Sequence, residues 1–137
     1  MMLVIDNNVL FALMKPDSSA SKIFHSLNKK LLAPEHIKKE FKKHEKECML
    51  KSNLGKQEFE KRLTEVEARV IFYGPLEYSR SFNDALAVVD DPDDAHYLAL
   101  ALSLGASIWS NDAHFRKQRL VGVYTTRDMV ELVLGGE

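Results

Sequence analysis

The chain has little cysteine, little net charge and no long apolar run, and each shortage excludes a class of protein. Cys48 is the only cysteine, so an internal disulfide or a zinc site of several cysteines is excluded. A lone thiol fits a reducing compartment. No apolar run approaches the ~20 residues that a membrane helix needs, and the first residues lack the basic and long apolar segments of a secretory signal. The expectation is a soluble cytoplasmic protein that does not contact a membrane.

The near-balance of charge limits the ways in which the chain can bind nucleic acid. Lys and Arg number 19 and Asp and Glu number 20, which gives a formal net charge of −1. This balance argues against a protein held to nucleic acid or membrane by bulk charge alone. It leaves room for an enzyme that binds nucleic acid locally and releases it.

Size and patterning indicate one α/β domain over residues 1–137. A chain of 137 residues has the commonest size for a single domain, and no repeat, low-complexity segment or long linker divides it. Short apolar runs alternate with helical patterns, which predicts a three-layer α/β/α fold around a central, mostly parallel five-stranded sheet. The strands are expected at 2–5, 31–33, 70–73, 107–110 and 123–125. Helices are expected at 9–14, 19–27, 35–48, 57–68, 81–89, 91–104 and 126–134. The Lys- and Glu-rich part of this pattern, residues 35–65, predicts two solvated amphipathic helices.

Acidic residues fall at positions that this topology brings to one edge of the sheet. Asp6 ends the first predicted strand and Asp112 follows the fourth. In an open parallel sheet, ligands bind outside the carboxyl ends of the strands. The acidic run 90–94 begins a helix that leads into a parallel strand, so it starts at the same edge. Glu40, early in its helix, can also face that edge.

Carboxylates gathered in one cleft favour metal-assisted chemistry. They repel one another, and some stay protonated unless a cation is bound. Mg²⁺ and Mn²⁺ prefer oxygen ligands, and such ions neutralise the charge that builds on a transferring phosphoryl group. The acids therefore favour metal-dependent cleavage of phosphodiesters.

Each acid also has an ordinary structural interpretation. Asp6 suits a turn and Glu40 a surface helix. Asp91, with Pro92 behind it, has the pattern of an N-cap with proline at N1, which would place Asp94 at N3. Asp112 suits a cap of the following turn. The joint placement at one edge, rather than any single residue, favours a site.

The motifs resemble those of the PIN domain family. Residues 4–10 (VIDNNVL) resemble the opening strand and first acid of that family, and residues 34–41 (PEHIKKEF) are similar to the helix with its conserved Glu. Residues 91–101 (DPDDAHYLALA) and 108–115 (IWSNDAHF) resemble its third and fourth acidic motifs. The resemblance spans almost the whole chain in the right order, and includes PilT N-terminus-like and VapC-type toxin members.

The resemblance implies a function and a set of site residues. It implies a Mg²⁺- or Mn²⁺-dependent ribonuclease, in many members a toxin that forms a homodimer and is neutralised by a small antitoxin. The implied catalytic metal ligands are Asp6, Glu40, Asp94 and Asp112, and Asp91 is a further acid. Two positions depart from the pattern: Asn8 replaces a common hydroxyl residue, and Asn111 replaces a common basic or hydroxyl residue. Both amides can still donate and accept hydrogen bonds near the site.

Three other interpretations remain open at this stage. A PIN-like domain that binds RNA or protein without cutting is one, although the chain keeps all four acids. A zinc hydrolase is another, because His36, Glu40 and His44 are spaced four apart on one helix. A phosphotransferase with Asp6 as nucleophile is disfavoured, because Asn8 occupies the place of the usual second Asp.

Aromatic and basic residues supply weaker indications. Trp109, inside a strand, is expected in the core, and Tyr97 is expected to pack on its helix. Four basic side chains are candidates for contacts with phosphates: Lys15, Lys22, Arg116 and Lys117.

Overall fold

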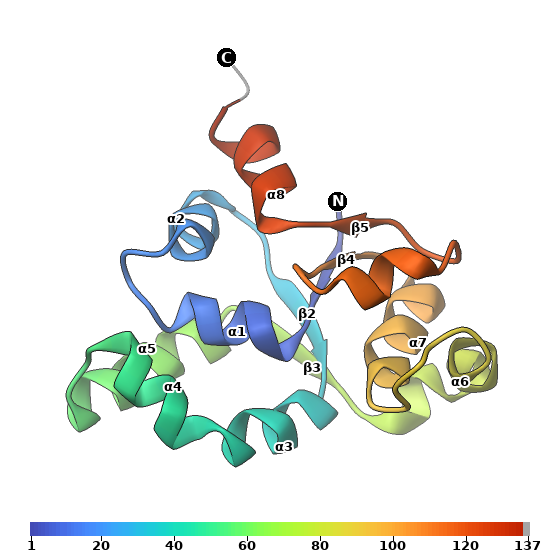
Figure 1. The fold of residues 1–137 in the computed structure, drawn as a ribbon, viewed down its shortest axis with the longest axis horizontal. Coiled ribbons are helices and arrows are strands. Elements are labelled where there is room, and N and C mark those ends of the chain that lie inside the picture. The colour runs from blue at the N-terminus through green and yellow to red at the C-terminus, as the bar shows by residue number, and fades with distance from the viewer. Residues whose placement is uncertain (136–137) are drawn as a thin grey trace.

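The computed structural model of the chain describes residues 1–135 and is built around one parallel sheet (Figure 1). Its strands are short: β1 (Leu3–Ile5), β2 (Leu31–Pro34), β3 (Val70–Tyr73), β4 (Ser107–Trp109) and β5 (Val123–Tyr124). They lie in the order β3-β2-β1-β4-β5, and every pairing is parallel. The expected sheet was mostly parallel; within residues 1–135 it is parallel throughout.

The strand order creates a switch point beside β1. From β1 the chain winds outward through β2 to β3, then returns to the other side of β1 for β4 and β5. Val4 pairs with Leu32 of β2 on one side and with Ile108 of β4 on the other. The connections that leave the carboxyl ends of β1 and β4 therefore diverge, which opens a crevice at this edge of the sheet.

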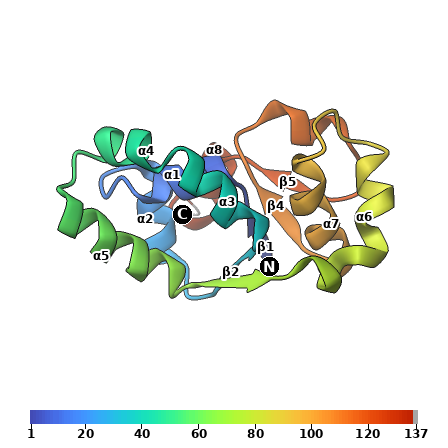
Figure 2. The same ribbon diagram turned by 90° about the horizontal axis from the view of Figure 1, so that it is seen from below.

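Helices cover both faces of the sheet (Figures 1 and 2). Within residues 1–135 none of them is long and apolar enough to cross a membrane. The α-helices are α1 (Asn7–Leu13), α2 (Ser19–Ser26), α3 (His36–Lys43), α4 (Glu45–Ser52), α5 (Lys56–Glu67), α6 (Ser79–Leu86), α7 (Asp94–Leu104) and α8 (Thr126–Val133). The two 3-10 helices are η1 (Pro75–Tyr78) and η2 (Ala113–Lys117).

The helices and the sheet form three layers, as predicted. On one face α7 contacts β1, β2 and β4, and α6 packs against α7. The helices α1, α2 and α8 lie together on the opposite side (Figure 2). All residues of β1 and β2 are buried, as is typical of central parallel strands covered on both faces. Trp109 lies fully inside this core, as expected.

The long connection from β2 to β3 contains three helices rather than the two predicted. The expected helix over 35–48 breaks at His44, whose backbone (φ −120°, ψ 18°) is not helical. Ile37 and Phe41 are buried on α3 and Cys48 on α4, while His44 lies exposed at the bend. Each of the two short helices therefore buries apolar residues of its own.

A buried arginine fastens this helical excursion to the rest of the domain. Arg62 of α5 donates from Nε and Nη2 to the carbonyl oxygen of Leu13, at 3.0 and 2.8 Å. It also donates to the hydroxyl of Ser21 in α2. The carbonyl at the end of α1 is thereby satisfied by a side chain from another element.

The helix before β4 starts later than predicted. The sequence suggested a helix from 91 with Asp91 as its N-cap, but α7 begins at Asp94. Residues 91–93 form a turn in which the Asp91 carboxylate accepts from the Asp93 amide at 3.0 Å, and the N-cap Asp93 makes no side-chain capping bond. The Asp91 side chain thus stabilises the turn before the helix, and Asp94 lies in the first turn of α7.

The C-terminal end of α7 yields a stability prediction. Gly105 ends the helix in the left-handed region (φ 65°), as the sequence suggested, and a Cβ there would meet no atom within 4 Å. Gly105→Ala should lower the free energy of unfolding by about 1 kcal/mol through backbone strain alone. Urea denaturation would measure it. Gly122→Ala, at a glycine without positive φ, is the control and should change stability by less than about 0.5 kcal/mol. An unchanged Gly105→Ala protein would contradict the assignment.

Candidate active site

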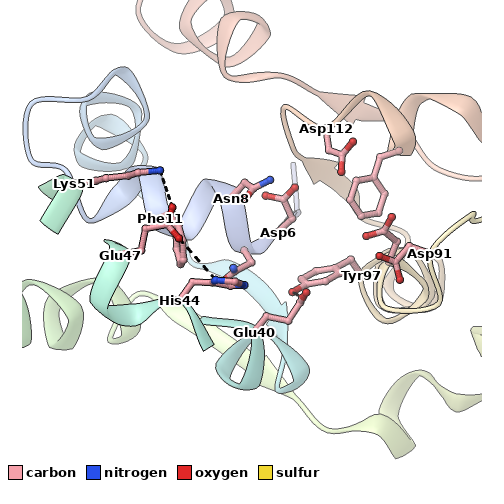
Figure 3. Close-up of a pocket in the computed structure, with 13 residues that line it drawn as sticks. Asp6, Asn8, Phe11, Glu40, His44, Glu47, Lys51, Asp91, Tyr97 and Asp112 are labelled. Atoms are coloured by element: carbon pink, nitrogen blue, oxygen red, sulfur yellow. Dashed lines mark hydrogen bonds and ion pairs between the residues drawn. The ribbon is translucent and has the colours of Figure 1, made fainter. Parts of the chain in front are cut away.

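A pocket at the switch point brings the predicted acids together. Asp6 follows β1, Glu40 lies on α3, Asp94 opens α7 and Asp112 follows β4; all four line the pocket. Figure 3 shows the labelled carboxylates approaching it from different elements. Asn8 and Asp91 also line it. The complete lining is Asp6, Asn7, Asn8, Phe11, Glu40, His44, Glu47, Lys51, Asp91, Asp94, Tyr97, Asp112 and Phe115.

Asp6 is the most buried of the acids, with 5% of its surface exposed. One carboxylate oxygen caps α1 by accepting from the Val9 amide at 2.8 Å. The other accepts from the Ser110 hydroxyl. Burial raises the pKa of Asp6 from 3.8 to about 6, against the lowering effect of these two hydrogen bonds. The sequence suggested a turn at Asp6; the residue instead caps α1, and this structural role coexists with a place in the pocket.

Ser110 connects two of the acids and was not identified from the sequence. Its hydroxyl donates to Asp6 and accepts from the Asp112 amide at 3.0 Å, and its side chain is fully buried. It therefore fixes the carboxylate after β1 against the backbone after β4. The available signal was a hydroxyl at the end of an apolar strand, two residues before an acid.

Asp94 is half-buried among like charges. Burial first, and then the nearby carboxylates of Asp91, Asp112 and Glu40, raise its pKa from 3.8 to about 6. Proximity of several carboxylates makes each harder to ionise. Without a bound cation, ionising all of the pocket carboxylates near neutral pH therefore costs free energy.

Glu40 is held by a tyrosine from the opposite layer. The hydroxyl of Tyr97, which is buried in α7, donates to Glu40 Oε1. Burial and this hydrogen bond raise the pKa of Tyr97, so its hydroxyl stays protonated and remains a donor. The sequence placed Tyr97 only as a packing residue. Its hydroxyl also orients the carboxylate of Glu40, which the flexible Glu40 side chain would otherwise leave free to rotate.

Asp112 and Asn111 take different directions after β4. Asp112 caps η2: its Oδ1 accepts from the His114 amide at 2.9 Å and lies 3.0 Å from His114 Nδ1. The Asn111 side chain turns away to α8, where it accepts from the Thr126 amide at 2.7 Å and donates to its hydroxyl at 2.9 Å. Asn111, expected as an additional site residue, does not line the pocket, because it joins β4 to α8.

A second asparagine adds an unsatisfied oxygen to the pocket. The Oδ1 atom of Asn7 is buried and has no hydrogen-bond partner within residues 1–135. A buried acceptor without a partner costs free energy, so such an atom indicates an interaction that the protein alone does not provide. The sequence singled out Asn8 and missed Asn7.

The donor set fits a hard divalent cation. Carboxylate and amide oxygens surround the pocket, two acids have raised pKa values, and one buried oxygen lacks a partner. A bound cation would favour the ionised carboxylates and satisfy that oxygen. Mg²⁺ and Mn²⁺ prefer such oxygen ligands.

A lysine paired with a glutamate lies on the other side of the pocket, on α4. Lys51 Nζ lies 2.9 Å from Glu47, and His44 Nδ1 lies 3.9 Å from the same carboxylate (Figure 3). Lys51 thus brings a positive charge to the pocket lining. The basic residues considered from the sequence, Lys15, Lys22, Arg116 and Lys117, do not line it.

The suggested histidine patch on α3 is rearranged. His44 lies at the bend and does not join His36 and Glu40. Asp93 takes the third place: donor atoms of His36, Glu40 and Asp93 lie within 4.8 Å of one another. The zinc-hydrolase interpretation required His44, so the three residues it named do not form a site.

Solved structures share this fold at low sequence identity. A chain of VapBC2 from Rickettsia felis, bound to a promoter DNA fragment, has a TM-score of 0.66 at 11% identity, covering 91% of this chain and 98% of its own. FitAcB from Neisseria gonorrhoeae gives 0.58 at 14% identity, with 92% and 99% covered. FitAB bound to an IR36 DNA fragment gives 0.58 at 15% identity, with 91% and 95% covered. A comparison with curated proteins finds no match.

The family follows from a match along nearly the whole chain. The family model described as PIN domain matches residues 4–132, from β1 into α8. That range includes the four predicted acids that line the pocket and all of the sheet except Leu3. The resemblance first seen in the sequence motifs is thereby confirmed, and the chain belongs to the PIN domain family.

Proposed function

We propose that this chain is a metal-dependent endoribonuclease that hydrolyses phosphodiester bonds with Mg²⁺ or Mn²⁺ at Asp6, Glu40, Asp94 and Asp112. One observation above all supports the proposal. Four carboxylates from separate elements line one pocket at the switch point, and the pKa values of two of them are raised to about 6. Such crowding has little structural purpose without a cation to offset it.

Asp6, Asp94 and Asp112 would hold the cation, with Glu40 completing the site directly or through water. Asp91, Asn7 and Asn8 would support it from the rim of the pocket. When bound, the ion lowers the pKa of water and neutralises charge on the transferring phosphoryl group.

The protein's own residues supply orientation. The Val9 amide and the Ser110 hydroxyl fix both oxygens of Asp6, so this carboxylate cannot rotate freely. The Tyr97 hydroxyl holds Glu40 in the same way. Lys51 offers an ammonium group to a substrate phosphate on the α4 side of the pocket.

RNA as substrate and an antitoxin as partner are part of the proposal. They follow from the resemblance of the motifs to VapC-type toxins, and two of the similar structures are of VapBC2 and FitAB. A homodimer is proposed on the same ground. Cys48 is a buried free thiol, which suits a reducing compartment such as the cytoplasm.

Removal of Asp94 should abolish cleavage. Asp94→Asn keeps the shape but removes a charge that the cation needs, so metal-dependent cleavage of an RNA panel should fall at least about 100-fold, the equivalent of several kcal/mol. Gel assays with Mg²⁺, Mn²⁺ and EDTA would measure it. Asp90→Asn is a matched control: Asp90 is exposed and pairs with Lys117 at 3.3 Å. Equal activity in native and Asp94→Asn proteins would refute the mechanism. No cleavage by the folded native chain with either metal would favour a PIN domain that only binds RNA or protein.

The stability of the metal-free protein should depend on pH through the pocket acids. Between pH 3.8 and about 6 the folded state binds more protons than the unfolded state, because Asp6 and Asp94 have raised pKa values. The free energy of unfolding therefore falls as pH rises through this interval. Mn²⁺ should raise Tm more above pH ~7 than near pH ~5, because it binds the ionised carboxylates. Thermal melts with and without Mn²⁺ would test this, and equal Tm shifts at both pH values would contradict it.

Loss of the Tyr97 hydroxyl should weaken the site without dismantling it. Tyr97→Phe removes the donor to Glu40 but keeps the ring in the core. We expect the affinity for Mn²⁺ to fall about 10-fold, as is usual when a group supporting a metal ligand is lost. Calorimetric titration would measure it, with Tyr124→Phe on the edge strand β5 as control. An unchanged affinity would show that Tyr97 serves packing alone.

A further inference from the structure

A second cluster of donors lies beside the pocket and is centred on His36. His36 Nε2 is 3.3 Å from Asp93 Oδ1 and 3.8 Å from Glu40 Oε1. The Nε2 atom is buried, yet it has no hydrogen-bond partner within residues 1–135. Both carboxylates lie within ion-pair distance of Nε2, but neither forms a hydrogen bond with it, so this buried ring nitrogen still lacks a hydrogen-bond partner.

We propose that His36, Glu40 and Asp93 form a second cation site, beside the oxygen-lined pocket and sharing Glu40 with it, that takes a nitrogen-preferring divalent ion of the Zn²⁺ class.

Two of the three donor separations are close to those around such an ion, and all three are within 4.8 Å. Zinc bonds of 2.0–2.2 Å in a tetrahedron place neighbouring ligand atoms about 3.3–3.6 Å apart. The 3.3 Å between His36 and Asp93 already meets this value, and the 3.8 Å to Glu40 needs only a small side-chain movement. His36 and Glu40 are one helical turn apart on α3, and Asp93 lies just before α7. Three protein ligands would leave a position for water.

The His36 ring is held in place before any ion arrives. It stacks on His96, with ring centroids 3.9 Å apart and planes at 11°. His96 is fixed in turn by a 2.8 Å hydrogen bond between its Nδ1 and the Tyr78 hydroxyl. The stack therefore aims Nε2 at the carboxylates. The Asp93 side chain is 52% exposed, which leaves a path for the ion from solvent.

The donor set separates this site from the pocket by chemistry. Imidazole suits Zn²⁺ and related transition ions, while Mg²⁺ prefers oxygen donors. Magnesium should therefore fill the pocket and leave the His36 site to a zinc-like ion. Glu40 belongs to both, so two dications would compete for one carboxylate, and each should weaken the binding of the other. This coupling, unlike the site itself, rests on the proposed function.

Zinc titration in excess Mg²⁺ tests the site. Calorimetry on the native chain should show Zn²⁺ binding whose affinity falls at least about 10-fold in His36→Gln, since even loss of a supporting residue costs that much. Asp93→Asn should show the same loss from an exposed position, which keeps the test valid if His36→Gln fails to fold by circular dichroism. His114→Gln is the matched control, because His114 lies 3.0 Å from a different acid, Asp112.

The outcomes separate this proposal from the nuclease proposal. Zinc binding that survives Asp94→Asn but not His36→Gln or Asp93→Asn supports a distinct site, whatever happens to RNA cleavage. Equal zinc affinity in native, His36→Gln and Asp93→Asn chains overturns it. Loss of binding in His114→Gln alone also overturns it, since the ion would then sit at Asp112.

Discussion

The burial of carboxylates that also repel one another is the constraint around which this domain is organised. Asp6 is almost completely buried and Asp94 half-buried, and the pKa of each is raised to about 6. The protein offsets part of this cost with hydrogen bonds to Asp6 from the Val9 amide and Ser110. The remainder is left for a cation, so the same crowding that reduces the stability of the empty domain would provide its affinity for metal.

The parallel sheet makes that crowding achievable. Because β1 and β4 are neighbours with diverging connections, residues 104 positions apart, Asp6 and Ser110, meet in one hydrogen bond. The carboxylates belong to rigid elements or their first turns, which limits their motion. Residues that support the acids come from other layers: Tyr97 of α7 reaches Glu40 of α3 across the pocket. Such support fixes the orientation of ligands more firmly than the ligands' own rotamers would.

Glu40 links the two sites that we propose. Its Oε1 atom accepts from the Tyr97 hydroxyl and also lies 3.8 Å from His36 Nε2. The bend at His44 matters here, because it ends α3 soon after Glu40 and sends α4 along the pocket with Glu47 and Lys51. A straight helix over 35–48 would have carried these residues elsewhere. Arg62 holds the excursion against α1 and α2, so the placement of Glu40 depends on a buried contact far along the chain.

Local patterns in the sequence were enough to predict the five strands and the meeting of the four acids at one edge of the sheet, because short apolar runs followed by Asp or Gly indicate burial and chain reversal. The family was predicted from the resemblance of the motifs. Tertiary structure alone decided which polar atoms meet. Nothing local distinguishes Ser110 as the bridge from Asp6 to Asp112, or turns Asn111 toward Thr126 and Asn7 into the pocket. The start of α7 at Asp94 and the break at His44 also escaped prediction. Capping propensity and helical periodicity are weak local preferences, and packing between layers overrode both.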